Sequence, residues 1–561
     1  MEKTTGKLRK YLDILFSHQA MRIVLLIMVT LRSSALLAPF IGPLVKFTLI
    51  WSAAVLVKDL FTKRMLFTNR WRGLLYLFML LYGISTLVYY RENLARNVAT
   101  FCYMVTNLFV FYAYDPTQSR EEVKREVRNL CHSFMAVSLV TGLLTIVVFV
   151  LNIQYRFTYL SSGVEAEGQL GFFSGRMWGI LSNPNTTGAV AFINVIMIFI
   201  CVVMVRNNLS KTRRRFYLVN LIVQAIVFFL SNSRTAWYCM FLFILIVPFL
   251  ILMWEFPERI KNSTLKKLLK RTVSIALVAL LAFSGLENYA QTLLPKFVIS
   301  TTFFSEQFAQ LPNSEDKGLE DPDFSTEVDD VQRDDFGTSL GGRYYLWRAG
   351  VGIIANHPLL GVTAENIPTY ARLYAAWPTS YEEAERQFYE EQAELERQRE
   401  EQARLDAEAG ILPEEPAEET DEEEEPLVYE PYLPGIDSGL HNMLFQVAAS
   451  SGLPALLIIV AIALGFLWRL GRYFVWACKR KRLNPFVAAM SAMVLVLLAW
   501  SMSETGLIYG ISYSSIIFWS FVSYILYFID AETAVDPEFD KGRRPLLARL
   551  SDKVFGRKKG R

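Results

Sequence analysis

Three arginines and one histidine are the residues of this chain that could do chemistry together. Arg176, Arg234, Arg343 and His441 each lie close to a boundary between a polar and an apolar segment. Guanidinium groups form bidentate contacts with phosphate oxygens, so several of them can neutralise a diphosphate. An imidazole, with an ordinary pKa of about 6.5, can take up a proton near neutral pH. The combination predicts a site that binds a pyrophosphate group and accepts a proton.

The elements that must position these residues are membrane-spanning helices. The chain of 561 residues is 53% hydrophobic and 14% aromatic, which is typical of a polytopic membrane protein. A helix needs about 20 apolar residues to cross the hydrocarbon core. We therefore expect an all-α protein with about twelve transmembrane helices. The predicted segments are 21–39, 41–58, 73–90, 95–114, 132–152, 184–205, 216–231, 235–254, 272–290, 439–468, 485–503 and 507–529.

The positive charges predict the orientation of these segments. Lys/Arg clusters at 3–10, 58–72, 120–128, 206–215, 259–271, 469–482 and 541–561 all fall on one side when twelve segments cross the membrane. Short basic loops mark the cytoplasmic side, so we expect a multi-pass protein of the cell (plasma or inner) membrane with both termini cytoplasmic. No removable signal peptide is predicted at the N-terminus. The three arginines and His441 then share the extracytoplasmic face.

Each of the four residues also has a structural interpretation. An arginine at a helix end commonly extends to lipid headgroups, and a single histidine at an interface is more often structural than catalytic. Asn183-Pro184-Asn185, which follows Arg176, could be no more than a helix cap, with proline in the first turn of the helix. Three arginines on the extracytoplasmic face run against the usual charge bias, however, and this favours a functional role.

A long acidic stretch, 291–438, separates the predicted ninth and tenth segments. It holds 34 of the 54 acidic residues of the chain but only 10 of its 57 lysines and arginines. Within this large extracytoplasmic loop, 343–373 is predicted to be an ordered helix and turn, and 379–426 a charged helix followed by a disordered insertion, without catalytic role. The expected organisation is transmembrane helices 1–9 in 1–290, the loop in 291–438, helices 10–12 in 439–530 and a basic cytoplasmic tail in 531–561.

Metal and disulfide chemistry have weak support in the sequence. The five cysteines all lie in or beside predicted segments and show no metal-ligand spacing, so we expect small buried residues rather than a disulfide framework. Asp321-Pro322-Asp323 and Asp329-Asp330 could bind a metal, but they lie in a generally acidic region where such spacings arise by chance. We expect no metal and no cofactor.

The order of these motifs resembles a known family. Arg176 with Asn183-Pro184-Asn185, Ser231-Asn232-Ser233-Arg234, Gly342-Arg343 followed by Trp347 and His357-Pro358-x2-Gly361, and His441-Asn442 with Gly452 occur in this order over about 175–460. This pattern is similar to that of the O-antigen ligase/polymerase superfamily. The resemblance implies a GT-C-like helical membrane glycosyltransferase, metal-independent and inverting. Its donor would be an undecaprenyl-diphosphate-linked glycan and its acceptor a glycan, lipid or cell-wall hydroxyl.

Roles for individual residues follow from that resemblance. Arg176, Arg234 and Arg343 would stabilise the diphosphate leaving group, and His441 would take the acceptor proton. Trp347 could stack on a sugar or simply pack the loop helix onto the bundle. The expected catalytic residues are therefore His441, Arg234 and Arg343, and the expected substrate contacts are Arg176, Asn183, Asn185, Trp347 and Asn442. Arg32, within the first segment, and Arg91, beside the turn between the third and fourth, are expected as secondary contacts, because an arginine within the membrane is a functional candidate.

Two alternatives stay open at this point. Twelve segments with internal cations also suit a lipid-linked glycan flippase or transporter, although no internal hydropathy repeat is present and a transporter does not need a loop of this length. A metal-dependent GT-C transferase that uses the acidic motif is the other. In each case the partners are the lipid bilayer and lipid-linked glycans, and no nucleic acid is expected.

Overall fold

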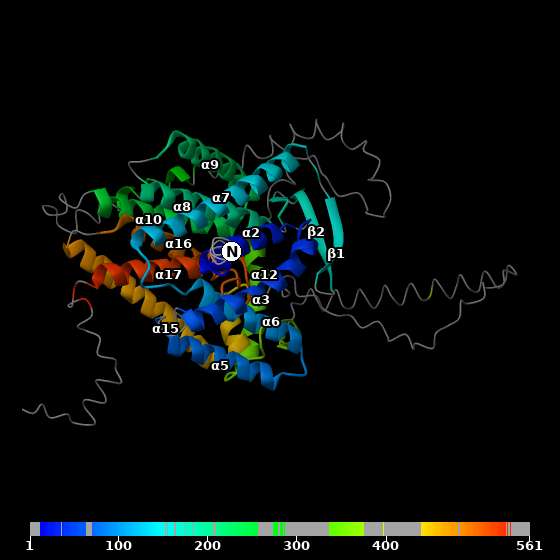
Figure 1. Cartoon of the computed structure of the whole chain (residues 1–561). Helices are drawn as coiled ribbons and strands as arrows, with labels where there is room; N and C mark the ends of the chain where they lie inside the picture. Colours follow the sequence, from blue (N-terminus) through cyan, green and yellow to red (C-terminus); the bar gives the residue numbers. More distant parts are fainter. Residues whose placement is uncertain are drawn as a thin grey trace, which may run out of the picture.

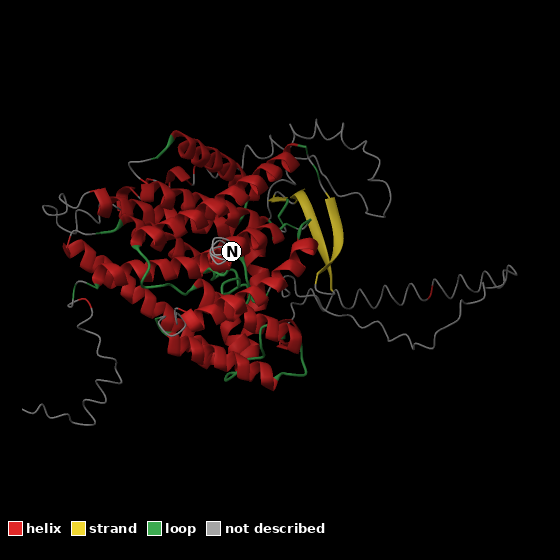
Figure 2. Cartoon of the chain, viewed as in Figure 1, coloured by secondary structure: helices red, strands yellow, loops and turns green. Residues whose placement is uncertain are grey.

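The computed structural model describes residues 12–62, 70–255, parts of 273–285, 336–374, Arg397 and 439–539, with short gaps inside these ranges. Its helices form one bundle (Figures 1 and 2). They are α2 (His18–Arg32), α3 (Ala38–Thr62), α5 (Arg72–Val88), α6 (Leu94–Val105), the π-helix η1 (Thr106–Phe111), α7 (Arg120–Val150), α8 (Pro184–Val205), α9 (Lys211–Ser231), α10 (Arg234–Glu255), α12 (Phe336–Asn356), α13 (Ile367–Tyr374), α15 (Met443–Arg480), α16 (Pro485–Trp500) and α17 (Tyr513–Thr533).

The prediction of a helical polytopic membrane protein is confirmed. Seven helices in the described part of the chain are long and apolar enough to cross a membrane, and three further apolar helices are shorter. The predicted segment 272–290 lies largely outside the described residues, and so do 291–335, 379–426 except Arg397, and the tail after 539. A count of twelve transmembrane helices stays a prediction.

The all-α prediction is wrong at one place, the connection between α7 and α8. Here β1 (Tyr155–Ser161), β2 (Val164–Phe173) and β3 (Arg176–Gly179) form a small antiparallel sheet in the order β1-β2-β3. The sheet extends from the bundle in Figure 2. Polar and apolar residues alternate in Tyr155–Tyr159, which is the period of a strand, and a reading directed at apolar spans passes over it. The sheet matters because β3 carries Arg176.

The centre of the bundle is built from helices that are apolar on every side. In α8 and α16, buried residues occur around the whole helix, as expected for a helix enclosed by others. α16 packs against α8, α10 and α17, whereas α15 packs against α5 and α12. This arrangement brings the first residues of α8, α10 and α15 to the same end of the bundle as the connection between α16 and α17.

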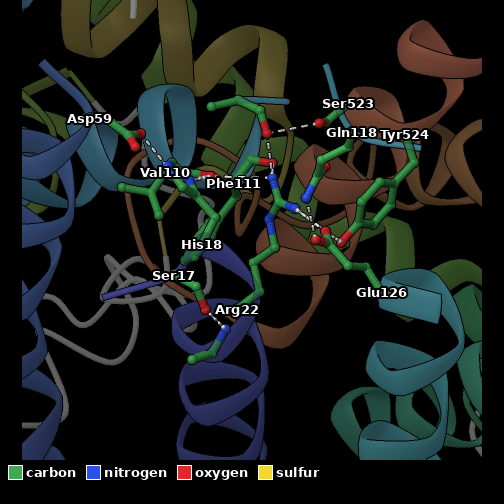
Figure 3. Close-up of polar contacts among 12 residues, drawn as sticks. Ser17, His18, Arg22, Asp59, Val110, Phe111, Gln118, Glu126, Ser523 and Tyr524 are labelled. Carbon is green, nitrogen blue, oxygen red and sulfur yellow. Dashed lines mark hydrogen bonds and ion pairs between the residues drawn. The ribbon is translucent and has the colours of Figure 1, made fainter. Parts of the chain in front are cut away.

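A polar cluster lies at the end of η1, around Arg22 of α2 (Figure 3). We call Arg22, His18, Asp59, Glu126 and Tyr524 the Arg22 cluster. The Arg22 guanidinium donates to the carbonyls of Phe111 (2.8 Å) and Ala113, and to the Tyr524 hydroxyl (3.0 Å). A carboxylate oxygen of Glu126 lies 3.7 Å from it. His18 contacts both the Val110 carbonyl and the Asp59 carboxylate. These partners satisfy carbonyls that a helix end leaves unpaired.

Candidate functional site

Glu504 is the residue at which the candidate site converges. It lies in the connection between α16 and α17, and its carboxylate faces three other elements. Oε1 lies 3.6 Å from Nη2 of Arg343 on α12 and accepts a hydrogen bond from Nδ2 of Asn185 on α8 (3.3 Å). Oε2 lies 3.3 Å from Nδ1 of His441. The side chains of Arg343, His441 and Glu504 are 26%, 17% and 20% exposed, so the site is recessed but open to solvent.

Asn185 is the second point of convergence. Its Oδ1 accepts hydrogen bonds from Nη2 of Arg176 (2.8 Å) and from the hydroxyl of Ser233 (2.9 Å). Ser233 directly precedes Arg234, the first residue of α10. All four motifs singled out in the sequence are thereby joined. We call Arg176, Asn185, Ser233, Arg343, His441 and Glu504 the Glu504 cluster.

His441 adopts a strained backbone conformation. Its φ is +48°, in the left-handed region that costs a non-glycine residue about 1–3 kcal/mol. The neighbouring residues hold it there. The backbone amide of Met443 donates to the Ser501 carbonyl (2.9 Å), and the side-chain amide of Asn442 donates through Nδ2 to the Met502 carbonyl (3.0 Å). Asn442 Oδ1 also caps α15 by accepting from the Leu444 amide (2.9 Å). Strain kept by so many bonds is typical of a functional position.

The contact between His441 and Glu504 determines what the imidazole can do. Nδ1 is within ion-pair distance of the carboxylate, yet the two groups are not aligned as a hydrogen bond. Catalytic hydrogen bonds are often poorly aligned before substrate binds. A carboxylate beside Nδ1 favours a proton on that nitrogen, which leaves Nε2 as the basic one. Among the described residues, no side chain bonds to Nε2.

The comparison with protein families matches a region that contains α10 and α12, the helices of Arg234 and Arg343. The O-antigen ligase family model matches residues 219–385, which include Ser233, Arg234 and Arg343. This match supports the resemblance to the O-antigen ligase/polymerase superfamily. None of the curated proteins compared with the chain matches it. The family match supports a function in cell-surface polysaccharide biosynthesis.

The two asparagines of Asn183-Pro184-Asn185 have different positions. Asn183 is exposed, and its Oδ1 accepts a hydrogen bond from the Thr186 amide (3.0 Å), which makes it the cap of α8. Asn185, two residues later, points into the Glu504 cluster. The capping alternative thus describes Asn183, whereas Asn185 joins Arg176 and Ser233 to Glu504, and its contact with a substrate stays a prediction.

Arg234 is brought beside the cluster by close packing of α8 against the turn between α9 and α10. A Cβ atom on Gly188 would lie 2.8 Å from both Ala236 Cβ and Ser231 Oγ, so only glycine allows this approach. Arg234 is half-buried and follows Ser233, whose hydroxyl is bound to Asn185. The tight turn therefore places Arg234 in the chain directly after a member of the Glu504 cluster.

Trp347 packs at the interface between α12 and α15. Its ring stacks on Phe445 of α15 with centroids 6.0 Å apart and an interplanar angle of 21°. The indole nitrogen is buried without a hydrogen-bond partner. Because Trp347 lies one turn from Arg343, this stacking fixes α12 on α15 and so fixes the position of Arg343. The packing alternative considered from the sequence is the one the geometry supports.

Arg32 and Arg91 lie apart from the Glu504 cluster. Both side chains are exposed, and Arg91 donates from Nε to the Tyr90 hydroxyl (2.9 Å). Arg32 ends α2, close to Ser34, which forms a backbone bridge with Leu181. Among the described residues, neither arginine contacts a member of the cluster. A substrate role for these two stays a prediction without structural support.

The His357-Pro358-x2-Gly361 motif supplies hydrogen-bond partners at a kink in α15. At Gly452 (φ +82°) this helix leaves helical geometry, so backbone groups lose their normal partners. The turn between α12 and α13 supplies them: the Val362 amide donates to Ala449 (2.8 Å), and the Leu453 amide donates to Pro358 (2.7 Å). Any side chain on Gly361 or Gly452 would collide with backbone atoms.

The His357 ring reinforces this docking. Its two nitrogens contact the hydroxyls of Tyr89 (2.9 Å) and Tyr374 (3.2 Å), which belong to the end of α5 and to α13. Burial lowers the pKa of His357, with the Glu92 carboxylate acting in the opposite direction. With both nitrogens occupied, His357 is a structural residue that joins the loop to the bundle.

The residue that the sequence did not point to is Glu504. A signal was present: a lone carboxylate, Ser503-Glu504-Thr505, stands in a short connection between two strongly apolar segments on the face predicted for the arginines. Within the described residues, no group of three acidic, histidine or cysteine side chains could hold a metal ion. Asp321, Asp323, Asp329 and Asp330 lie outside these residues.

Proposed function

We propose that this protein is a metal-independent, inverting glycosyltransferase. It transfers a glycan from an undecaprenyl-diphosphate carrier to an acceptor hydroxyl on the extracytoplasmic face of the membrane, as a ligase or a polymerase. The observation that carries the proposal is the convergence of a strained histidine, Glu504 and the arginines of two separate elements in one open site.

The arginines provide the electrostatic part of the reaction. As the bond between the sugar C1 and the phosphate oxygen breaks, its electrons move to the diphosphate, whose growing charge must be stabilised. Arg176 and Arg343 are the members of the Glu504 cluster that carry positive charge, and Arg234 stands beside it. A diphosphate would replace the weak 3.6 Å contact between Arg343 and Glu504 with charge-assisted bonds.

His441 and Glu504 provide the proton transfer. The acceptor oxygen attacks C1 from the face opposite the leaving diphosphate, which inverts the configuration. Its proton passes to Nε2 of His441, and the carboxylate of Glu504 stabilises the resulting imidazolium through Nδ1. The proton is later released to solvent. Asn442 serves this step indirectly by holding His441 in place.

The length of α16 agrees with a lipid-linked donor. This helix has 16 residues, which is about 24 Å, whereas the hydrocarbon core is about 30 Å thick. The Glu504 connection therefore begins below the level that a full-length transmembrane helix would reach. A diphosphate attached to a membrane-embedded lipid could enter a site at this depth without leaving the bilayer.

The test is turnover by purified protein in lipid, supplied with an undecaprenyl-diphosphate oligosaccharide and candidate acceptors. Release of undecaprenyl diphosphate is compared for wild type, His441→Ala, Arg343→Ala and Arg234→Ala, with and without EDTA. Arg125→Ala, an exposed arginine on α7, is the matched control. We expect activity that ignores EDTA, is unchanged in the control, and falls by about 10²–10⁴ in His441→Ala.

Two other results would contradict the proposal in different ways. Activity that EDTA abolishes but that survives His441→Ala would favour the metal-dependent transferase. Absence of turnover with every acceptor, together with movement of the carrier lipid between leaflets, would favour a transporter.

A further inference from the structure

We propose that Asn107, on the π-helix η1, is a positioning residue that holds the 501–512 segment and, through it, Glu504. This inference rests on the proposed function, because it assigns Asn107 a role in that reaction. Asn107 contacts no member of the Glu504 cluster in the described structure. It acts on the backbone that carries Glu504.

The contact is made by one amide group. Asn107 is fully buried, and its Nδ2 donates to the carbonyls of both Ile508 (3.0 Å) and Gly510 (2.9 Å). Both amide hydrogens are thereby used on one short segment, four and six residues after Glu504. A leucine of similar size could fill the same space but could donate neither bond.

The 501–512 segment needs such partners because it is irregular backbone inside a membrane bundle. Leu507 and Ile508 are 1% exposed. The carbonyl groups of such buried residues must be hydrogen-bonded within the protein, since a buried polar group without a partner is costly. The Trp519 indole donates to Leu507 (2.7 Å), and the Ser512 hydroxyl donates to Gly506 (2.8 Å). Asn107 adds the bonds to Ile508 and Gly510, and it does so from the N-terminal half of the chain.

Asn107 is itself fixed by the element on which it lies. α6 changes at Thr106 from α-helical to π-helical bonding, and the Tyr112 amide donates to the Asn107 carbonyl (3.2 Å). The end of η1 is anchored by Arg22 and His18, as Figure 3 shows. Such π-helical turns often occur at functional sites. Here the wider turn places a buried amide against the 501–512 segment.

The expected consequence is a loss of rate rather than of donor binding. Without the two bonds, the 501–512 segment has unpaired carbonyls and shifts to satisfy them. A displacement of about 1 Å in a catalytic group can cost about 10²-fold. Because Asn107 lies away from the arginines, Asn107→Leu should lower kcat by about 10–100-fold and leave the KM for the donor within about threefold.

The experiment combines hydrogen exchange with a double-mutant cycle. Wild type, Asn107→Leu and the control Asn220→Leu are compared in lipid, each alone and combined with Glu504→Gln. Asn220 is also a fully buried asparagine, but its Nδ2 donates to the Phe216 carbonyl of its own helix and its Oδ1 accepts from Nδ2 of Asn194, so these bonds lie away from the 501–512 segment. We expect faster exchange over 501–512 in Asn107→Leu only, and a kcat loss that largely disappears when Glu504 is already replaced.

The outcomes separate the two proposals. Unchanged exchange over 501–512, or equal kcat losses with and without Glu504→Gln, would overturn the role of Asn107. Faster exchange without turnover in any protein, wild type included, would support the tether and contradict the proposed transferase. If Asn107→Leu does not fold, Asn107→Ser, which keeps one hydroxyl donor, is measured in its place with the same expectations at reduced size.

Discussion

The Glu504 cluster and the Arg22 cluster contain the same residue types but differ in how their charges are satisfied. At Arg22, which is 2% exposed, the guanidinium bonds to backbone carbonyls and a tyrosine, and both His18 nitrogens are occupied. Arg22 and His18 each have one carboxylate nearby, Glu126 and Asp59 respectively. Around Glu504, one carboxylate serves His441 and Arg343 and, through Asn185, is linked to Arg176.

A structural ionic cluster thus differs from a reactive one in its exposure and in how its charged groups are paired. A buried cluster with matched charges holds helices together and has no capacity for a ligand. A partly exposed cluster in which one carboxylate faces an arginine and a histidine, and in which Nε2 of that histidine has no side-chain partner among the described residues, can bind an anion and accept a proton. Four predictions test this distinction.

The largest effect is expected at the two histidines. His441→Ala should lower kcat by about 10²–10⁴ with little change in thermal stability, since it removes the base from a partly exposed position while the backbone stays in the same conformation. His18→Ala should do the opposite, keeping kcat per folded molecule and lowering the melting temperature. Turnover and thermal unfolding of both variants in lipid provide the measurement. Similar kcat losses in the two variants would remove the distinction between the clusters.

Arg22→Met should have the next largest effect, on stability. It removes the cation beside the Glu126 carboxylate and the guanidinium that donates to the Phe111 carbonyl, and breaking a buried ion pair costs about 3–5 kcal/mol. A large fall in melting temperature is therefore expected. Arg343→Met in the half-exposed cluster is the control and should change stability little. An unchanged melting temperature in Arg22→Met would show that this cluster is not structural.

Glu504→Gln should lower kcat by about 10–100-fold, the range found for groups that orient a functional histidine. The amide keeps the size of the side chain but cannot stabilise the imidazolium. The KM for the donor should stay the same or fall, because the carboxylate no longer competes with the diphosphate for Arg343. Steady-state kinetics with varied donor measure both constants. A rise in KM without change in kcat would make Glu504 a donor-binding group instead.

The smallest effect is a pH dependence at His357. Because burial lowers its pKa in the folded protein, unfolding favours the protonated form. Its contribution to docking is therefore complete above the pKa of the unfolded state, about 6.5, and decreases as the pH falls below it. Hydrogen exchange over 358–363 at pH 7.5 and pH 5.5 should show weaker protection in acid. A His357→Phe variant should lose that difference; if it does not, other groups control the docking.

Much of the site could be predicted from the sequence, because its motifs lie at the ends of apolar segments. The length of those segments indicates where the chain turns back, so Arg176, Arg234, Arg343 and His441 could be placed on one face before any contact was known. The structure brings Arg176, Arg343 and His441 into one cluster, with Arg234 beside it. It also distinguishes Asn185 from Asn183, which sequence spacing could not, since both lie near the start of the same helix.

By itself the sequence determined the membrane class, the helical segments and the order of the motifs, because hydrophobicity and charge act locally along the chain. Only the tertiary structure decided that Glu504 joins His441 to the arginines, that the His357 motif repairs α15, and that Asn107 reaches the 501–512 segment. The physical reason is that these contacts satisfy polar groups across 60 to 400 residues of chain. Which residue becomes a partner at that distance depends on how the helices pack, and the local sequence pattern does not indicate that partner.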